Sequence, residues 1–150
     1  MEDAVRNLID QNEIQALLTR YTEMVDKREW KRMDEIFAPA ASIDYTSSGG
    51  VSGPYRETLE WLASALEPWP LNLHFISNFN IRTDGDAARS SCYFMAPMGR
   101  EEPDGSQTMT TNAGYYHDDL VRTQAGWRIQ ARVCEQTIMT GLPQDYVIPR

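Results

Sequence analysis

The fold is decided where the hydrophobic pattern of the chain changes, at Leu71-Asn72-Leu73-His74-Phe75-Ile76-Ser77-Asn78-Phe79-Asn80-Ile81. Here apolar residues alternate with polar ones, which is typical of a strand with one buried face. Before this segment apolar residues recur at helical spacing, and after it come further strand-like runs. Helices followed by a series of long antiparallel strands predict an α+β fold. We expect the N-terminal helices to pack on one face of a curved, mostly antiparallel sheet that encloses a pocket.

Three helices are expected before residue 71. The segment Asp10-Gln11-Asn12-Glu13 reads as a capping box for the first, although helix could begin earlier, and its apolar stripe is Ile14, Leu17, Leu18, Tyr21 and Val25. A short second helix ends at Pro39 and is followed by a strand over residues 42–46. Gly53-Pro54 opens the third helix, because proline is favoured in the first turn.

Three further strands are expected, over residues 87–98, 108–122 and 127–138. Asp84-Gly85 is a hairpin signal just before the first of them. Residues 99–106 read as a polar loop, and residues 141–150 as a proline-punctuated tail. No repeat or linker interrupts the pattern, so residues 1–150 are expected to form a single domain.

The charge balance narrows the range of partners. The 150 residues carry a net charge of −8, which argues against nucleic acid or an anionic membrane surface as a partner. There is no basic start followed by an apolar run, and no stretch of about 18 apolar residues, so neither a signal peptide nor a membrane span is expected. Cys92 and Cys134 are far apart and predict buried reduced thiols, and hence a cytoplasmic protein.

No cofactor is expected from the sequence. The two histidines, His74 and His117, are distant from each other, and the two cysteines are also separated, so they do not form the spacing of a zinc site. No glycine-rich loop that could cradle a phosphate is present, so no nucleotide cofactor is implied.

Asp26 and His74 are the candidates for chemistry. His74 lies inside an apolar strand, and Asp26 ends the first helix, where periodicity alone predicts a surface or capping residue. A carboxylate that orients an imidazole and stabilises its protonated form makes a general base. The pair would therefore be a general-base dyad if the fold brings the two side chains together.

Five segments, in this order, resemble a known superfamily: Val25-Asp26-Lys27-Arg28-Glu29-Trp30, Ile43-Asp44-Tyr45, His74-Phe75-Ile76, Leu120-Val121-Arg122 and Gly126-Trp127-Arg128-Ile129. The chain resembles the cone-shaped α+β barrels named after nuclear transport factor 2, in the branch of scytalone dehydratase and the SnoaL-like polyketide cyclases. The resemblance spans roughly residues 14–138. It implies the same cone-shaped fold for this chain.

The resemblance also implies a site. Asp26 would pair with His74, and Tyr45 would polarise a substrate carbonyl. The second histidine of the family follows a Val-Pro pair, and here Ala96-Pro97-Met98 places Met98 at that position. A Ser-x-Asn pair of the family is aligned with Tyr115 and His117. Asn78 and Tyr21 complete the expected substrate-binding residues, with Tyr115, His117 and Met98.

Some of these residues have a plainer interpretation. Tyr45 and Tyr115 could be core aromatics whose hydroxyls are hydrogen-bonded. His117 could be an exposed strand histidine instead of a pocket residue that replaces the missing family histidine. Both interpretations remain open at the level of sequence.

The expected function is that of a cofactor-independent lyase. It would remove water from a small cyclic or aromatic hydroxy-ketone by means of the Asp26–His74 pair. One alternative is a cyclase or isomerase that uses the same proton abstraction. Another is a non-catalytic small subunit of a ring-hydroxylating dioxygenase. Relatives assemble through the outer face of the sheet, so a homo-oligomer, dimer or trimer, is expected.

Overall fold

The helices and the shorter strands come first along the chain, and the long strands follow. The computed structural model describes residues 1–150 and begins with α1 (Glu2–Asp26), η1 (Trp30–Glu35), β1 (Phe37–Asp44), η2 (Thr46–Ser48), β2 (Ser52–Pro54) and α2 (Tyr55–Leu66). It continues with β3 (Leu71–Asn72), β4 (Phe75–Asp84), β5 (Ala87–Glu101), β6 (Gln107–Thr123) and β7 (Gly126–Thr140). No helix is long and apolar enough to cross a membrane.

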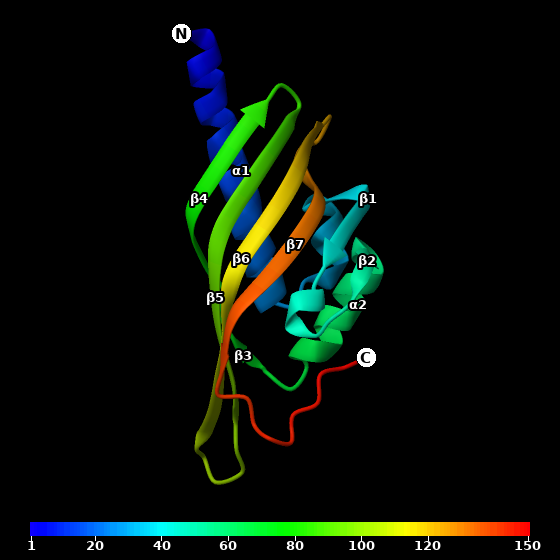
Figure 1. Ribbon diagram of the computed structural model, residues 1–150, viewed down its shortest axis with the longest axis vertical. Coiled ribbons are helices and arrows are strands. Elements are labelled where there is room, and N and C mark those ends of the chain that lie inside the picture. Colours follow the sequence, from blue (N-terminus) through cyan, green and yellow to red (C-terminus); the bar gives the residue numbers. More distant parts are fainter.

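The strands form one curved sheet with the order β2-β1-β7-β6-β5-β3, and β4 also pairs with β5. All pairs are antiparallel except β1 with β7, which is parallel. The α+β class and the mostly antiparallel curved sheet are confirmed. The sheet does not close into a barrel, because its two ends do not pair with each other. Figure 1 shows the long helix α1 running along one face of the twisted sheet, with α2 beside β1 and β2.

The first helix begins at Glu2, eight residues before the expected capping box. The capping role for Asp10 is wrong: this side chain is buried within α1, and its carboxylate pairs with Arg122 at 2.7 Å. The indole of Trp127 lies against the same carboxylate at 3.5 Å. The apolar stripe is confirmed as buried core, and the residues are Ile14, Leu17, Leu18, Tyr21 and Val25.

Several element boundaries differ from those expected. The short second helix is a 3-10 helix that ends at Glu35, and β1 already begins at Phe37, so Pro39 lies inside a strand and does not end a helix. The β5, β6 and β7 strands are each longer than expected.

A β-bulge in β4 reverses which residues face the core. The pairing of β4 with β5 shifts between Ser77 and Asn80, and Asn78 has a left-handed φ of 55°. Before the bulge Ile76 faces inward and Phe75 is exposed, whereas after it Phe79 and Ile81 pack on the core. The extra residue of a bulge changes the phase of the alternation. The simple alternation expected for residues 71–81 is therefore wrong in its first half.

The two cysteines are free and buried, as expected. Burial raises the pKa of the Cys92 thiol to about 11 and that of Cys134 to about 12. Both thiols are therefore protonated near neutral pH, and neither has the thiolate character of a reactive cysteine.

Candidate active site

An apolar pocket lies between the inner face of the sheet, α2 and the C-terminal tail. Nineteen residues line it and sixteen of them are hydrophobic. Its empty volume is about 710 Å³ when the part open to solvent is included, so the space that the walls enclose is smaller. No Lys, Arg, Asp or Glu side chain lines it, and seven of the lining residues are tyrosine, tryptophan or phenylalanine: Tyr21, Tyr45, Trp61, Trp69, Phe94, Tyr116 and Tyr146.

Strand register places three side chains in one row on the floor of this pocket. Asn72 pairs with Met98 and Ile76 with Phe94, so His74, midway between them, lies beside Ala96. Ala96 in turn pairs with Asn112 on β6. Two strand spacings, about 10 Å, therefore separate His74 from Asn112. The small side chain of Ala96 between them leaves room for a ligand to reach both.

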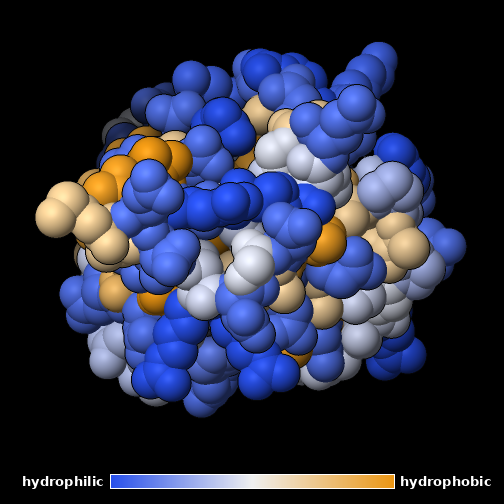
Figure 2. All heavy atoms as spheres, turned by 90° about the horizontal axis from the view of Figure 1, so that it is seen from above, coloured by the Kyte–Doolittle hydropathy of each residue, from blue (hydrophilic) through white to orange (hydrophobic).

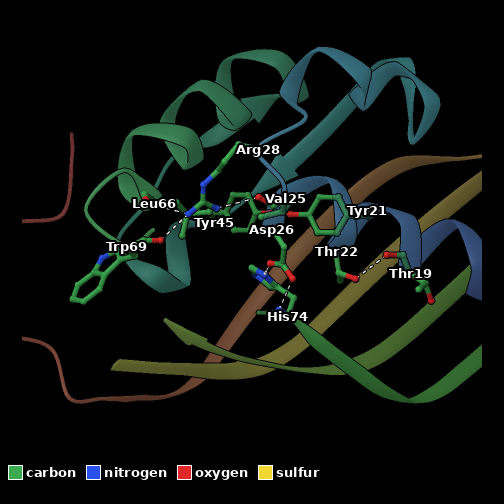
Figure 3. A network of polar contacts seen from close by, with 10 residues as sticks. All are labelled: Thr19, Tyr21, Thr22, Val25, Asp26, Arg28, Tyr45, Leu66, Trp69 and His74. Atoms are coloured by element: carbon green, nitrogen blue, oxygen red, sulfur yellow. Dashed lines mark hydrogen bonds and ion pairs between the residues drawn. The ribbon is translucent and has the colours of Figure 1, made fainter. Parts of the chain in front are cut away.

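The fold brings Asp26 and His74 together. Asp26 is the last residue of α1, and its Oδ1 lies 2.7 Å from Nδ1 of His74. Its Oδ2 accepts the backbone N–H of His74 at 2.9 Å. The side chains are 17% and 9% exposed, and Figure 3 shows the carboxylate facing the imidazole.

This double contact fixes the imidazole. A carboxylate accepts hydrogen bonds, so Nδ1 carries the proton that Asp26 accepts, and the neutral ring keeps its lone pair on Nε2. His74 also lines the pocket. The arrangement can therefore take a proton at Nε2 and stabilise the resulting imidazolium through Asp26.

Two tyrosine hydroxyls meet at the pocket wall. The hydroxyls of Tyr21 and Tyr45 hydrogen-bond to each other, and both residues are buried. Burial raises the pKa of Tyr45 well above its usual range, and nearby Arg132 opposes this shift. Both hydroxyls are neutral near neutral pH. One proton serves the bond between them, which leaves the other hydroxyl proton free to be donated.

A buried ion pair supports these tyrosines from behind. Arg132 Nε and Nη2 donate to the two carboxylate oxygens of Asp118 at 2.7 and 2.8 Å, and both side chains are fully buried. The guanidinium carbon lies 4.2 Å from the ring centroids of both Tyr21 and Tyr116. The cation thus packs on two rings that line the pocket.

Three of the expected substrate-binding residues lie outside the pocket. Tyr115 and His117 are on the outer face of β6, where Tyr115 contacts the ring of Tyr93, and His117 Nε2 lies 2.8 Å from Glu135. These two assignments are wrong, because a shift of one residue along a strand moves a side chain to the other face. Tyr116 lines the pocket in their place. Asn78, in the bulge of β4, is exposed and does not line the pocket either.

Among the other expected residues, Tyr21, Tyr45, His74 and Met98 line the pocket, and Asp26 does not line it but contacts His74. Asn112 was missed. It lines the pocket, and its Oδ1 is buried without a hydrogen-bond partner. The signal was in the sequence: Thr110-Thr111-Asn112 has the hydroxyl-x-Asn form of the family pair.

Comparisons with known proteins show the family of the chain. The SnoaL-like domain family matches residues 6–133. The chain belongs to the SnoaL-like family. This SnoaL-like chain is 38% identical over 140 residues to the uncharacterized protein Rv2910c of Mycobacterium tuberculosis, covering 91% of this chain and 93% of that protein.

Solved structures share the fold at low identity. A putative scytalone dehydratase from Novosphingobium aromaticivorans has a TM-score of 0.77 and 17% identity, covering 99% of this SnoaL-like chain and 97% of that chain. A hexachlorocyclohexane dehydrochlorinase, LinA type 2, has a TM-score of 0.74 and 20% identity, covering 95% of both chains. At this identity the likeness shows the fold, and the fold alone does not define an activity.

Proposed function

We propose that this SnoaL-like protein is a cofactor-independent lyase that removes water from a small, uncharged cyclic or aromatic hydroxy-ketone. The observation that carries the proposal is the double contact of Asp26 with His74, which leaves Nε2 as the free nitrogen of a pocket residue. The absence of charged side chains from the lining favours an uncharged substrate. Two structural neighbours are named for removing water or hydrogen chloride.

In the proposed reaction His74 Nε2 takes a proton from the carbon next to the carbonyl. The electron pair of that C–H bond moves to form the enolate, whose oxygen accepts a hydrogen bond from the Tyr21–Tyr45 hydroxyl pair. Collapse of the enolate breaks the C–O bond to the hydroxyl group. The imidazolium returns its proton to the departing oxygen, which leaves as water, and His74 is again neutral.

Asn112 would orient the substrate at the other end of the row. Its Oδ1 is a buried acceptor without a partner, and an unpaired buried polar atom is costly. A substrate hydroxyl that donates to this oxygen would remove that cost. This contact would place the ring across Ala96, with its acidic carbon at His74.

An isomerase is the second candidate. Met98 occupies the place where the resemblance puts a second histidine, so His74 is the one histidine in the pocket. A double-bond shift needs one base that removes a proton and returns it to another carbon, and no leaving group has to be protonated. The same residues would carry out this reaction.

The test is an NMR assay of the wild-type protein in D2O with a panel of cyclic hydroxy-ketones and the corresponding ketones without a hydroxyl group. An unsaturated product and released water support the lyase. Deuterium exchange or a shifted double bond without loss of the hydroxyl group would instead indicate the isomerase. Binding with neither turnover nor exchange across the panel would rule out both and favour a non-catalytic role.

Replacing Asn112 with leucine should lower kcat/KM by about 10- to 100-fold, mainly through KM. The leucine has a similar size but cannot pair with a substrate hydroxyl, and one such hydrogen bond contributes about 1–3 kcal/mol. Met139→Leu, at the neighbouring position on β7, is the matched control for wall volume. Equal effects of the two substitutions would contradict a polar role for Asn112.

We also propose that copies of the chain associate through the outer face of the sheet. Large apolar side chains are exposed there on β4–β7: Phe75, Tyr93, Met95, Val133 and Ile138. By contrast, Figure 2 shows that hydrophilic side chains cover most of the end of the molecule that carries the N-terminus. Contiguous exposed apolar surface is typical of an interface.

Sedimentation velocity at micromolar concentration should therefore show a dimer or trimer, and Val133→Lys should shift it toward monomer. The reason is that a buried lysine at such an interface would lose its hydration without a partner. Arg82→Lys, on β4 of the same sheet, serves as a control that leaves the net charge unchanged. A wild-type protein that sediments only as a monomer would contradict the proposal.

A further inference from the structure

Arg28 has an unusual backbone for a residue with a side chain. It follows α1 by two residues and has a φ of 59°, in the left-handed region. Non-glycine residues are uncommon there, because the side chain crowds the backbone. Such a conformation persists where the surrounding contacts hold it, and it is often found near functional sites.

The side chain of Arg28 supplies those contacts. Nη1 donates to the carbonyl of Val25 at 3.0 Å, and Nη2 donates to the carbonyls of Leu66 at 3.2 Å and Trp69 at 2.8 Å. Val25 is in the last turn of α1, and Leu66 is the last residue of α2. The carbonyls at a helix C-terminus lack partners within the helix and carry partial negative charge. The Val25 and Leu66 carbonyls also accept one backbone N–H each, from Arg28 and Trp69. The guanidinium of Arg28 adds a second donor at both helix ends and so links them.

These two helix ends carry the two parts of the site. The end of α1 holds Asp26, which contacts His74. Leu66 and Trp69 line the pocket. Figure 3 shows the Arg28 guanidinium between Val25, Leu66 and Trp69, with Asp26 and His74 nearby. The Arg28 side chain thus joins two parts of the site. One is the carboxylate that orients the imidazole, and the other is the wall of the pocket.

The charge of Arg28 also reaches this pair. Burial lowers the pKa of Arg28, while the nearby Asp26 carboxylate raises it. Arginine stays protonated in proteins. A fixed positive charge therefore lies close to the carboxylate that contacts His74.

We infer that Arg28 is a positioning residue, which fixes Asp26 relative to the Leu66–Trp69 wall and tunes the basicity of His74 through Asp26. This inference rests on the proposed function of the Asp26–His74 pair. Arg28 does not line the pocket itself. Its effect on a substrate would therefore be indirect.

The experiment compares Arg28→Gln and Arg28→Lys by NMR titration of the histidine rings. The chain has two histidines, and His117, on the outer face of the sheet, is an internal reference. Arg28→Gln removes the charge and the fork of donors, so the titration midpoint of His74 should move upward by at least roughly 0.3 pH unit. Arg28→Lys keeps the charge and should leave this midpoint within roughly 0.2 unit of the wild type. The His117 midpoint should stay constant in both variants.

Arg32→Gln is the matched control. It removes the same charge four residues away, where Arg32 is 53% exposed and pairs with Glu29 and Glu35. A His74 midpoint in Arg28→Gln that equals that of the wild type and of Arg32→Gln would overturn the inference.

Hydrogen exchange of residues 66–72 provides a second measurement. Both Arg28 variants should exchange faster in this segment, because lysine has a single ammonium group and does not bridge two helix ends as a planar fork does. If Arg28→Gln does not fold, hydrogen exchange in the Arg28→Lys variant tests the inference. Faster exchange at 66–72 with an unchanged His74 midpoint supports the inference, and wild-type exchange there overturns it. Neither measurement needs a substrate, so failure of the proposed function would show separately, as a wild-type protein without turnover.

Discussion

Replacing His74 with alanine is expected to abolish turnover, with a loss of kcat of at least about 10³-fold and an intact fold. The reason is that Nε2 of His74 is the one histidine nitrogen available in the pocket. Burial raises the pKa of Tyr21, Tyr45, Tyr116 and Cys134, which keeps these neighbours neutral. General-base catalysis alone contributes about 10²–10⁴-fold. In the proposed reaction His74 also returns the proton to the departing oxygen, so its loss should affect both steps.

Asp26→Asn should be nearly as severe. The amide can still hydrogen-bond to the ring, but it does not stabilise the imidazolium, and it can impose the wrong tautomer. Residues that act as a unit have strongly non-additive effects. The double variant should therefore be little worse than His74→Ala alone.

The measurement is steady-state turnover of a substrate that the wild type converts, with circular dichroism as the control for folding. His117→Ala is the matched histidine control and should keep wild-type activity, since His117 lies on the outer face. Near-native rates in both His74→Ala and Asp26→Asn would show the mechanism to be wrong. Multiplicative losses in the double variant would show that the two residues do not act as a unit.

The sequence predicted the class of the fold because local patterns carry it. The apolar stripe of α1 and the alternation in β5–β7 each need only neighbouring residues. Asp26 was different: its position off the stripe favours the surface, and the resemblance alone pointed to the pocket. The structural reason is local, since α1 ends at Asp26 and the chain turns away through Arg28, so the stripe no longer describes which way the side chain points.

The phase of the strands was harder to predict than their presence. Tyr115 and Tyr116 are adjacent, and alternation does not say which of them faces the core. Pairing with the neighbouring strands decides this: Asn112 pairs with Ala96, and Tyr116 pairs with Cys92 and Cys134, all of which lie on the inner face. The error at Tyr115 and His117 and the missed Asn112 share one cause, because the alternation of β6 leaves open which of its two faces is the inner one. Register depends on contacts between distant segments and on loop lengths.

The burial of Arg132 was also not predictable from the sequence, because a charged residue in a strand is usually exposed. It lies instead fully buried against Asp118, and its Nη1 has no hydrogen-bond partner. Arg132→Met is expected to lower the free energy of unfolding by about 3–5 kcal/mol, since removal of one partner leaves a buried charge uncompensated. Urea unfolding followed by circular dichroism measures this loss.

The double variant Arg132→Met/Asp118→Leu should recover most of the loss. Replacing a buried ion pair by apolar residues of similar size is often neutral or stabilising. The exposed pair Arg89–Asp119, with side chains 86% and 60% exposed, is the matched control, and Arg89→Met should cost less than about 1 kcal/mol. If the double variant were as unstable as Arg132→Met, the energy would come from the packing of the guanidinium on Tyr21 and Tyr116 and not from the charge left on Asp118. In that case the cation would be a structural part of the aromatic wall, and the same substitution should also loosen the Tyr21–Tyr45 pair that the proposed reaction uses.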